Sequence, residues 1–268
     1  MKPRGVSLFQ ASWATLRREW LSHRLNRFLY WHLGLLAAAG ILALLVAPEN
    51  SERGVAWFLL HGVLYVVSLS SVLLGLSSAQ AEMDELPFLA TQPMGLGSWL
   101  AGKAVGLVGV VLPSGLLLVV PWLVLHGWSG VLVTFALASA AVCVALTLLG
   151  LAVGLWVRES VRALLTAVGV WFVLLFGTDL LLLVAAGSPW IREHPGWWVA
   201  PLMLNPLDAL RVLTMLAVEG AALSTLRASP LVQWWAGHPV AWLASCVGLW
   251  CVFLYLVAWA ATRRIRRS

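Results

Sequence analysis

Apolar residues gather along this chain in six long runs that charged residues hardly interrupt. A helix needs about 20 mostly apolar residues to cross a bilayer, and each run reaches that length. The runs predict six membrane-spanning helices at residues 28–47, 55–79, 99–125, 131–157, 163–186 and 240–261. We expect Pro113 and Pro121 to bend the third span, because proline removes a helical hydrogen bond.

Glycines that lie four residues apart share one face of a helix and let a second helix approach closely. Gly102 and Gly106 have this spacing in the third span, and Gly150 and Gly154 have it in the fourth. We therefore expect these two faces to pack against other helices.

Residues 6–21 have apolar side chains on one face, with arginines off that stripe. This pattern predicts an amphipathic helix within the cytoplasmic segment 1–27, lying at the membrane interface with its cations near the headgroups. Two interpretations stay open. The helix is either a passive anchor or an elbow that passes motion to the first span.

A second short helix is predicted inside the tryptophan-rich outer loop, residues 187–239. Asn205 can cap its N-terminus, with Pro206 at the first helical position. Asp208 suits the positive end of the helix dipole, and Arg211 lies three residues on and can pair with it. We expect this helix to end at about Val218–Glu219, before Gly220, and to lie along the outer membrane interface.

The composition agrees with a membrane protein. Of the 268 residues, 61% are hydrophobic and 10% are charged, whereas a soluble domain has about 45–50% apolar and about 25% charged residues. These values exclude a single soluble domain, and the apolar excess excludes intrinsic disorder. Three cysteines give no disulfide framework.

Lysine and arginine are distributed unevenly between the two predicted faces. The formal net charge is +6, and 13 of the 17 cations fall on the face that holds both termini. The acids show no such bias, so the pattern follows the positive-inside rule and does not indicate nucleic acid binding. Both termini, including the basic tail 262–268, are predicted to be cytoplasmic. A cleaved signal peptide is disfavoured, because 27 residues precede the first apolar run and that run exceeds a signal core.

The predicted cytoplasmic loop 80–98 carries three acids, followed by apolar residues and two helix breakers. An acidic cluster on this face suits a basic protein surface; the alternative is a solvated turn with incidental charge. The candidate docking residues are Glu82, Asp84, Glu85, Leu86, Phe88, Leu89, Gln92 and Pro93.

Asp179 lies two turns inside the fifth predicted span. An acid in the hydrocarbon is costly and usually faces protein or water. It is either a pathway or gating residue, or a packing acid that is hydrogen-bonded or kept neutral by burial.

Motifs for catalysis and cofactor binding are missing from the sequence. It has no G-x-x-x-x-G-K-[ST] and no H-E-x-x-H, and its six histidines are dispersed. We expect no catalytic residue, no cofactor and no metal site in this chain.

The loop reads E-x-D-E-L-x-x-L-x-x-Q-P-x-G from Glu82, and L-x-G-K follows from Leu100 to Lys103. With six spans and a cytoplasmic amphipathic helix, this resembles the type-2 family of ABC transporter permeases. The resemblance implies an all-α membrane protein with the type V exporter architecture: one permease domain over residues 1–268, with spans 1–5 in 28–186. It also implies a homodimer with two cytoplasmic ABC ATPase subunits, which would bind ATP and magnesium.

The second half resembles the NosY-type permeases in Val170-Trp171-Phe172, in Asp179-Leu180, in Asn205-Pro206-x-Asp208-x-x-Arg211 and in Glu219-Gly220. This resemblance implies a bacterial inner-membrane complex that matures the copper sites of nitrous oxide reductase. Its periplasmic partner would be a copper-handling β-helical protein, contacted through the outer helix at Asn205, Pro206, Asp208, Arg211 and Glu219. Two alternatives stay open: an exporter of a lipid, drug or peptide, and a membrane enzyme or assembly protein without ATP coupling.

Overall fold

The structure is a computed structural model, and it describes residues 27–46, 51–86, 96–187, 201–219 and 237–265, with residues 17, 88, 189 and 234. Every element within these ranges is helical. The predicted helix 6–21, apart from Arg17, lies outside the described residues. So do most of the outer loop and the last three residues of the tail.

Six helical segments are long and apolar enough to cross a membrane, which confirms the predicted fold class. Their ends agree with the predicted spans within four residues. The segments are α2 (Arg27–Val46); α3 (Glu52–Gly62) with η2 (Val63–Val67) and α4 (Ser68–Gln80); α6 (Leu96–Ser114) with η4 (Gly115–Leu118) and α7 (Val120–His126); α8 (Gly130–Trp156); α9 (Ser160–Ala186); and α14 (Pro239–Ile265).

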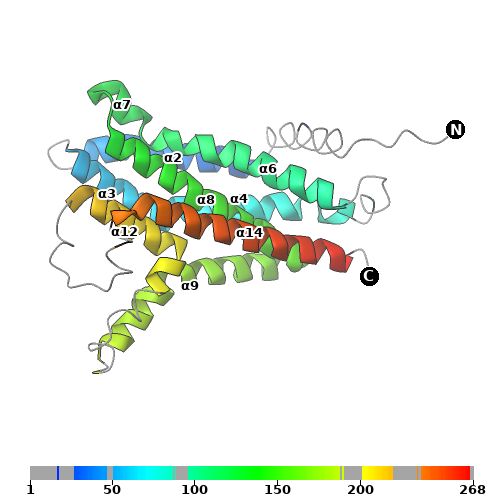
Figure 1. Ribbon diagram of the computed structural model, residues 1–268. Helices are drawn as coiled ribbons and strands as arrows, with labels where there is room; N and C mark the ends of the chain where they lie inside the picture. Colours follow the sequence, from blue (N-terminus) through cyan, green and yellow to red (C-terminus); the bar gives the residue numbers. More distant parts are fainter. Residues whose placement is uncertain are drawn as a thin grey trace.

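The spans run side by side and alternate in direction, so that α2 begins and α14 ends at the same end of the bundle (Figure 1). We call this the basic end, because it holds Lys103, Arg158, Arg162, Arg263 and Arg264. The opposite end, which the charge rule predicts to be outside, is called the outer end. Which end faces the cytoplasm stays a prediction.

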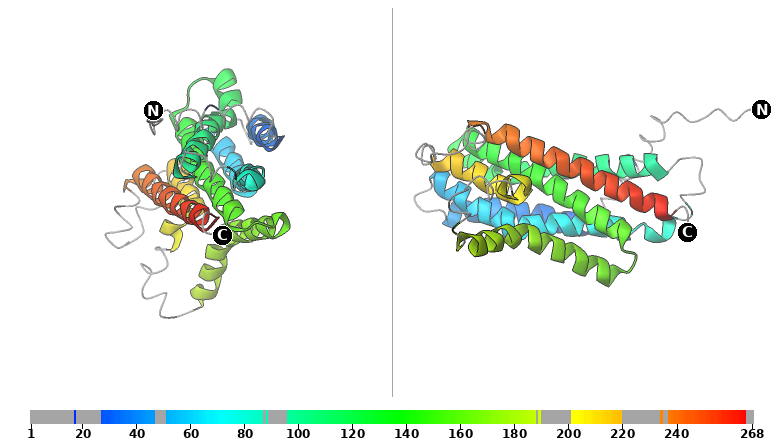
Figure 2. Two further views of the ribbon diagram at one scale, coloured as in Figure 1. Left: turned by 90° about the vertical axis from the view of Figure 1, so that its right-hand side faces the viewer. Right: turned by 60° about the horizontal axis from the view of Figure 1, so that its bottom comes forward.

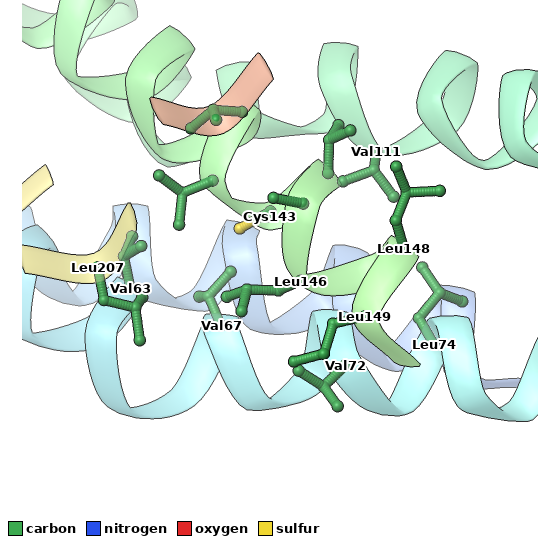
Figure 3. Close-up of a cluster of buried hydrophobic side chains, with 14 of the residues drawn as sticks. Val63, Val67, Val72, Leu74, Val111, Cys143, Leu146, Leu148, Leu149 and Leu207 are labelled. Carbon is green, nitrogen blue, oxygen red and sulfur yellow. The ribbon is translucent and has the colours of Figure 1, made fainter. Parts of the chain in front are cut away.

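The fourth span is the centre of the bundle. Helix α8 packs against α4, α14, α6 and α9, and Figure 3 shows its side chains Cys143, Leu146 and Leu149 among buried residues of η2, α4 and α12. By contrast α9 lies at the periphery, and its outer half turns away from the other spans (Figures 1 and 2).

Glycine makes the contact between α4 and α8 possible. A Cβ atom on Gly150 would lie 1.9 Å from the Val72 carbonyl oxygen, and one on Gly75 would lie 1.8 Å from that of Thr147. Gly154 meets Ala79 in the same seam. The predicted packing face of the fourth span is therefore confirmed. In the third span Gly102 and Gly106 are both buried.

Prolines divide the third span, as predicted. Pro113 lies near the end of α6, and Pro121 lies in the first turn of α7, with the 3₁₀ turn η4 between them. The second span has an irregularity that the sequence did not signal. Its π-helical turn η2 is followed by Ser68, whose hydroxyl donates to the Leu64 carbonyl and accepts from the Trp171 indole of α9.

Candidate functional site

The segment before helix α12 (Pro206–Glu219) reaches the middle of the bundle. The Leu204 carbonyl accepts hydrogen bonds from the Trp250 indole at 2.8 Å and from the Cys246 thiol at 3.4 Å. The Met203 carbonyl accepts from the Trp242 indole at 2.9 Å. These three donors, Trp242, Cys246 and Trp250, lie three, seven and eleven residues inside α14, or about 4, 10 and 16 Å along its axis, so the segment lies below the outer end of this span.

Contacts on the opposite side place the segment at the same depth. The Asn205 amide donates to the Leu174 carbonyl and to the Thr178 hydroxyl, both near the middle of α9. From Asn205, α12 runs toward α3 at the outer end (Figure 1). Residues 201–219 therefore form a re-entrant segment that dips into the bundle. Non-helical backbone at this depth needs partners from the protein, and α14 and α9 supply them.

The prediction that residues 206–219 lie along the outer interface is therefore wrong. All six residues from Asn205 to Leu210 are buried, and α12 packs against α14, α8 and α3. The apolar stripe is real, but Asp208 and Thr214 on the same helix are buried as well. Helix α9 supplies partners to Asn205 and Arg211. The N-terminal cap is confirmed: the Asn205 side-chain oxygen accepts from the Leu207 amide at 3.1 Å.

Two carboxylates share one guanidinium in this region. Nη1 of Arg211 lies 2.9 Å from Oδ1 of Asp179 and 3.0 Å from Oδ1 of Asp208. The Arg211–Asp208 pair within α12 is as predicted, whereas the bridge to Asp179 was not predicted. The Asp208 side chain is 1% exposed, and its second oxygen accepts from the Asn205 amide at 2.6 Å. We call Thr178, Asp179, Asn205, Asp208 and Arg211 the mid-depth cluster.

Asp179 itself is half exposed, with 49% of its side chain accessible, and it faces away from the tightly packed core. It is ion-paired rather than isolated. Formally the cluster carries two negative charges and one positive charge. Its contacts between Asn205 and Thr178 and between Arg211 and Asp179 tie α12 to α9.

The residues predicted to contact a periplasmic partner are placed as follows. Asn205, Pro206 and Asp208 are buried against their own chain, and Arg211 is partly buried. Glu219 ends α12, and its side chain lies outside the described residues. Contact between this helix and a partner protein stays a prediction.

A second polar network lies at the basic end. Oε1 of Glu82 accepts from Nζ of Lys103 at 2.9 Å, and its Oε2 accepts from the Trp99 indole at 2.9 Å. The Lys103 side chain is 1% exposed. Glu82 therefore joins the end of the second span to the start of the third. Lys103, which charge counting assigns to the cytoplasmic surface, is instead buried.

Gln80 ties the same end of the second span to two further helices. Its amide nitrogen donates to the carbonyls of Gly154 and Val157 at 3.0 Å, and these carbonyls end α8. Its amide oxygen accepts from the hydroxyl of Ser160, the first residue of α9. These contacts of Gln80 could not be predicted, because its partners lie more than 70 residues away along the chain.

The predicted docking residues of the 80–98 loop divide into two groups. Asp84 and Glu85, in the 3₁₀ turn η3 (Met83–Glu85), are exposed, as is Phe88. Glu82 and Leu86 are buried. Leu89, Gln92 and Pro93 lie outside the described residues. The exposed acidic turn therefore directly follows residues Gln80 and Glu82, which are hydrogen-bonded to other helices.

Among the described residues, no group of three His, Cys, Asp or Glu side chains could hold a metal ion. The fold and the two networks define a six-span, all-helical membrane protein with a re-entrant outer helix. No protein-family model and no curated protein matches the chain.

Proposed function

We propose that this chain is the membrane-spanning permease subunit of a type-2 ABC transporter. The observation that carries the proposal is the exposed acidic turn at the basic end. Asp84 and Glu85 project from a segment whose neighbours Gln80 and Glu82 are bonded to α6, α8 and α9. A load applied to this turn is therefore transmitted to three spans.

In this proposal the energy comes from partner subunits. Two copies of the chain pair with two cytoplasmic ATPases, which bind ATP and magnesium, and a basic surface of each ATPase contacts Asp84 and Glu85. The chain itself contributes no catalytic residue. The re-entrant segment faces the periplasm of a bacterial inner membrane.

The resemblance to NosY-type permeases supports a more specific role, the assembly of the copper sites of nitrous oxide reductase with a periplasmic β-helical copper-handling partner. In this proposal the partner handles the copper, and this chain supplies motion.

One observation favours a second candidate, an exporter of an apolar cargo such as a lipid. An apolar cavity of about 230 Å³ lies between the re-entrant segment and α14. It is lined by Met203, Leu204, Trp242, Cys246, Leu249 and Trp250, among others. An exporter would show ATPase activity that rises with an apolar substrate and would need no stable periplasmic partner.

The test is native mass spectrometry of the complex purified from its own host, with a charge-reversal variant. We expect the wild-type chain to copurify with an ATPase, and Asp84→Lys/Glu85→Lys to lose it. Glu159→Lys is the matched control, because Glu159 is an exposed acid at the same end that pairs with Arg162. The absence of an ATPase from the wild-type complex, or its retention by the double variant, would overturn the proposal.

A further inference from the structure

Among the described residues, four cation–ring contacts lie at the basic end, and they differ in their counter-charges. One is between Arg27 and Phe28 at the start of α2. Lys103 lies over Trp99, with Glu82 as its carboxylate partner. The guanidinium carbon of Arg263 lies 3.5 Å from the centre of the Trp259 ring, and that of Arg264 lies 5.8 Å from the centre of the Trp156 ring. Both arginines are exposed, and within the described part of the chain neither pairs with a carboxylate.

We propose that Arg263 and Arg264 form a binding site for the phosphate of an anionic phospholipid. Stacking on an indole occupies the face of a guanidinium and leaves the N–H groups at its edge for a phosphate, which guanidinium geometry matches well.

The surroundings favour a lipid over a soluble phosphate. Tryptophan rings prefer the headgroup level of a membrane. Trp156 ends α8 and is 48% exposed. On α14, Val252 and Leu256 are exposed on the turns that lead to the arginines, which offers an apolar track for an acyl chain. A soluble anion would gain nothing from that track.

The site also has a fixed shape. Trp259 lies beside the start of α6, because a Cβ on Gly97 would be 4.0 Å from its indole nitrogen. Trp156 belongs to α8 and its partner Arg264 to α14. The two arginines therefore sit where α6, α8 and α14 meet, and a headgroup bound there would hold the three helix ends together.

The test uses the full chain in nanodiscs of phosphatidylcholine with an increasing share of phosphatidylglycerol. Native mass spectrometry counts bound phosphatidylglycerol for the wild type, for Arg263→Gln/Arg264→Gln and for Arg162→Gln. The last is the matched control, because Arg162 is an exposed arginine at the same end that pairs with Glu159 at 2.7 Å.

We expect the double variant to bind phosphatidylglycerol about thirtyfold more weakly than the wild type, and the control to stay within about threefold of it. Inorganic phosphate added at millimolar concentration should not displace the lipid. Equal binding by the double variant and the control would overturn the site. Displacement by inorganic phosphate would also overturn it, since the ligand would then be a soluble anion.

Discussion

Replacing Arg211 by glutamine removes the cation that contacts both Asp179 and Asp208. The Asp208 carboxylate, 1% exposed, would then be left without a positive partner. Removing one partner of a buried ion pair costs about 3–5 kcal/mol. In a chain of this size, each 1 kcal/mol shifts the unfolding midpoint by about 2–4 °C. We therefore expect Arg211→Gln to lower the midpoint by roughly 6–20 °C.

The assay is thermal unfolding followed by intrinsic tryptophan fluorescence in a single detergent. Asp179→Asn is the comparison, because Arg211 keeps Asp208 as its partner and no buried charge is left without a counter-charge. We expect a smaller fall of the midpoint than for Arg211→Gln. The double variant Asp208→Asn/Arg211→Gln should recover more than half of the loss, since it removes the buried charge together with its partner. Equal small shifts for Arg211→Gln and Asp179→Asn, or no recovery in the double variant, would refute the reasoning.

Three further predictions can be checked in the same assay. Gly150→Ala would place a Cβ 1.9 Å from the Val72 carbonyl oxygen and should cost at least about 2 kcal/mol, whereas Gly109→Ala, with nothing within 4 Å, should be nearly neutral; similar midpoints would argue against the tight α4–α8 seam. Glu82→Gln removes the carboxylate that lies 2.9 Å from the buried Lys103 ammonium. It should cost about 1.5–3 kcal/mol, the contribution of a hydrogen bond to a charged group, and adding Lys103→Met should recover part of that loss, while the exposed Asp84→Asn should change little. Trp250→Phe removes the indole donor to the Leu204 carbonyl and should cost about 1–3 kcal/mol. The control is Trp128→Phe, because Trp128 is 80% exposed. An equal effect at both positions would contradict the role of α14 in holding the re-entrant segment.

The six spans could be predicted from sequence because a long apolar run is sufficient for a helix to cross the hydrocarbon core, whichever helices it later packs against. The helix signals at Asn205 and Pro206 were reliable for a similar reason. An N-cap is satisfied by the amide two residues on, so its chemistry is local. The bend at Pro113 and Pro121 is local as well.

The interactions that could not be predicted join residues that lie far apart along the chain. Asp179 reads as an isolated acid because Arg211 is 32 residues away, beyond the end of the fifth span. Lys103 reads as a surface cation because Glu82, 21 residues earlier, belongs to another helix. The amphipathic pattern of residues 206–219 is the same for a helix at the interface and for one inserted in the bundle. The donors on α14 decide between the two, and they are about 40 residues away.

The two polar networks share one helix. Ser160 begins α9 and bonds to Gln80 beside the acidic turn, while Leu174, Thr178 and Asp179 of the same helix bond to the re-entrant segment. A continuous helix transmits displacement along its axis far better than the loops at its ends. Helix α9 lies at the periphery of the bundle and contacts both α4 and α8 (Figure 2). Its Trp171 indole also donates to Ser68 at the start of α4. In the proposed transporter, a pull on the acidic turn therefore reaches the re-entrant helix through α9. Helix α14, bonded to Met203 and Leu204 from the other side, is the support against which that helix moves.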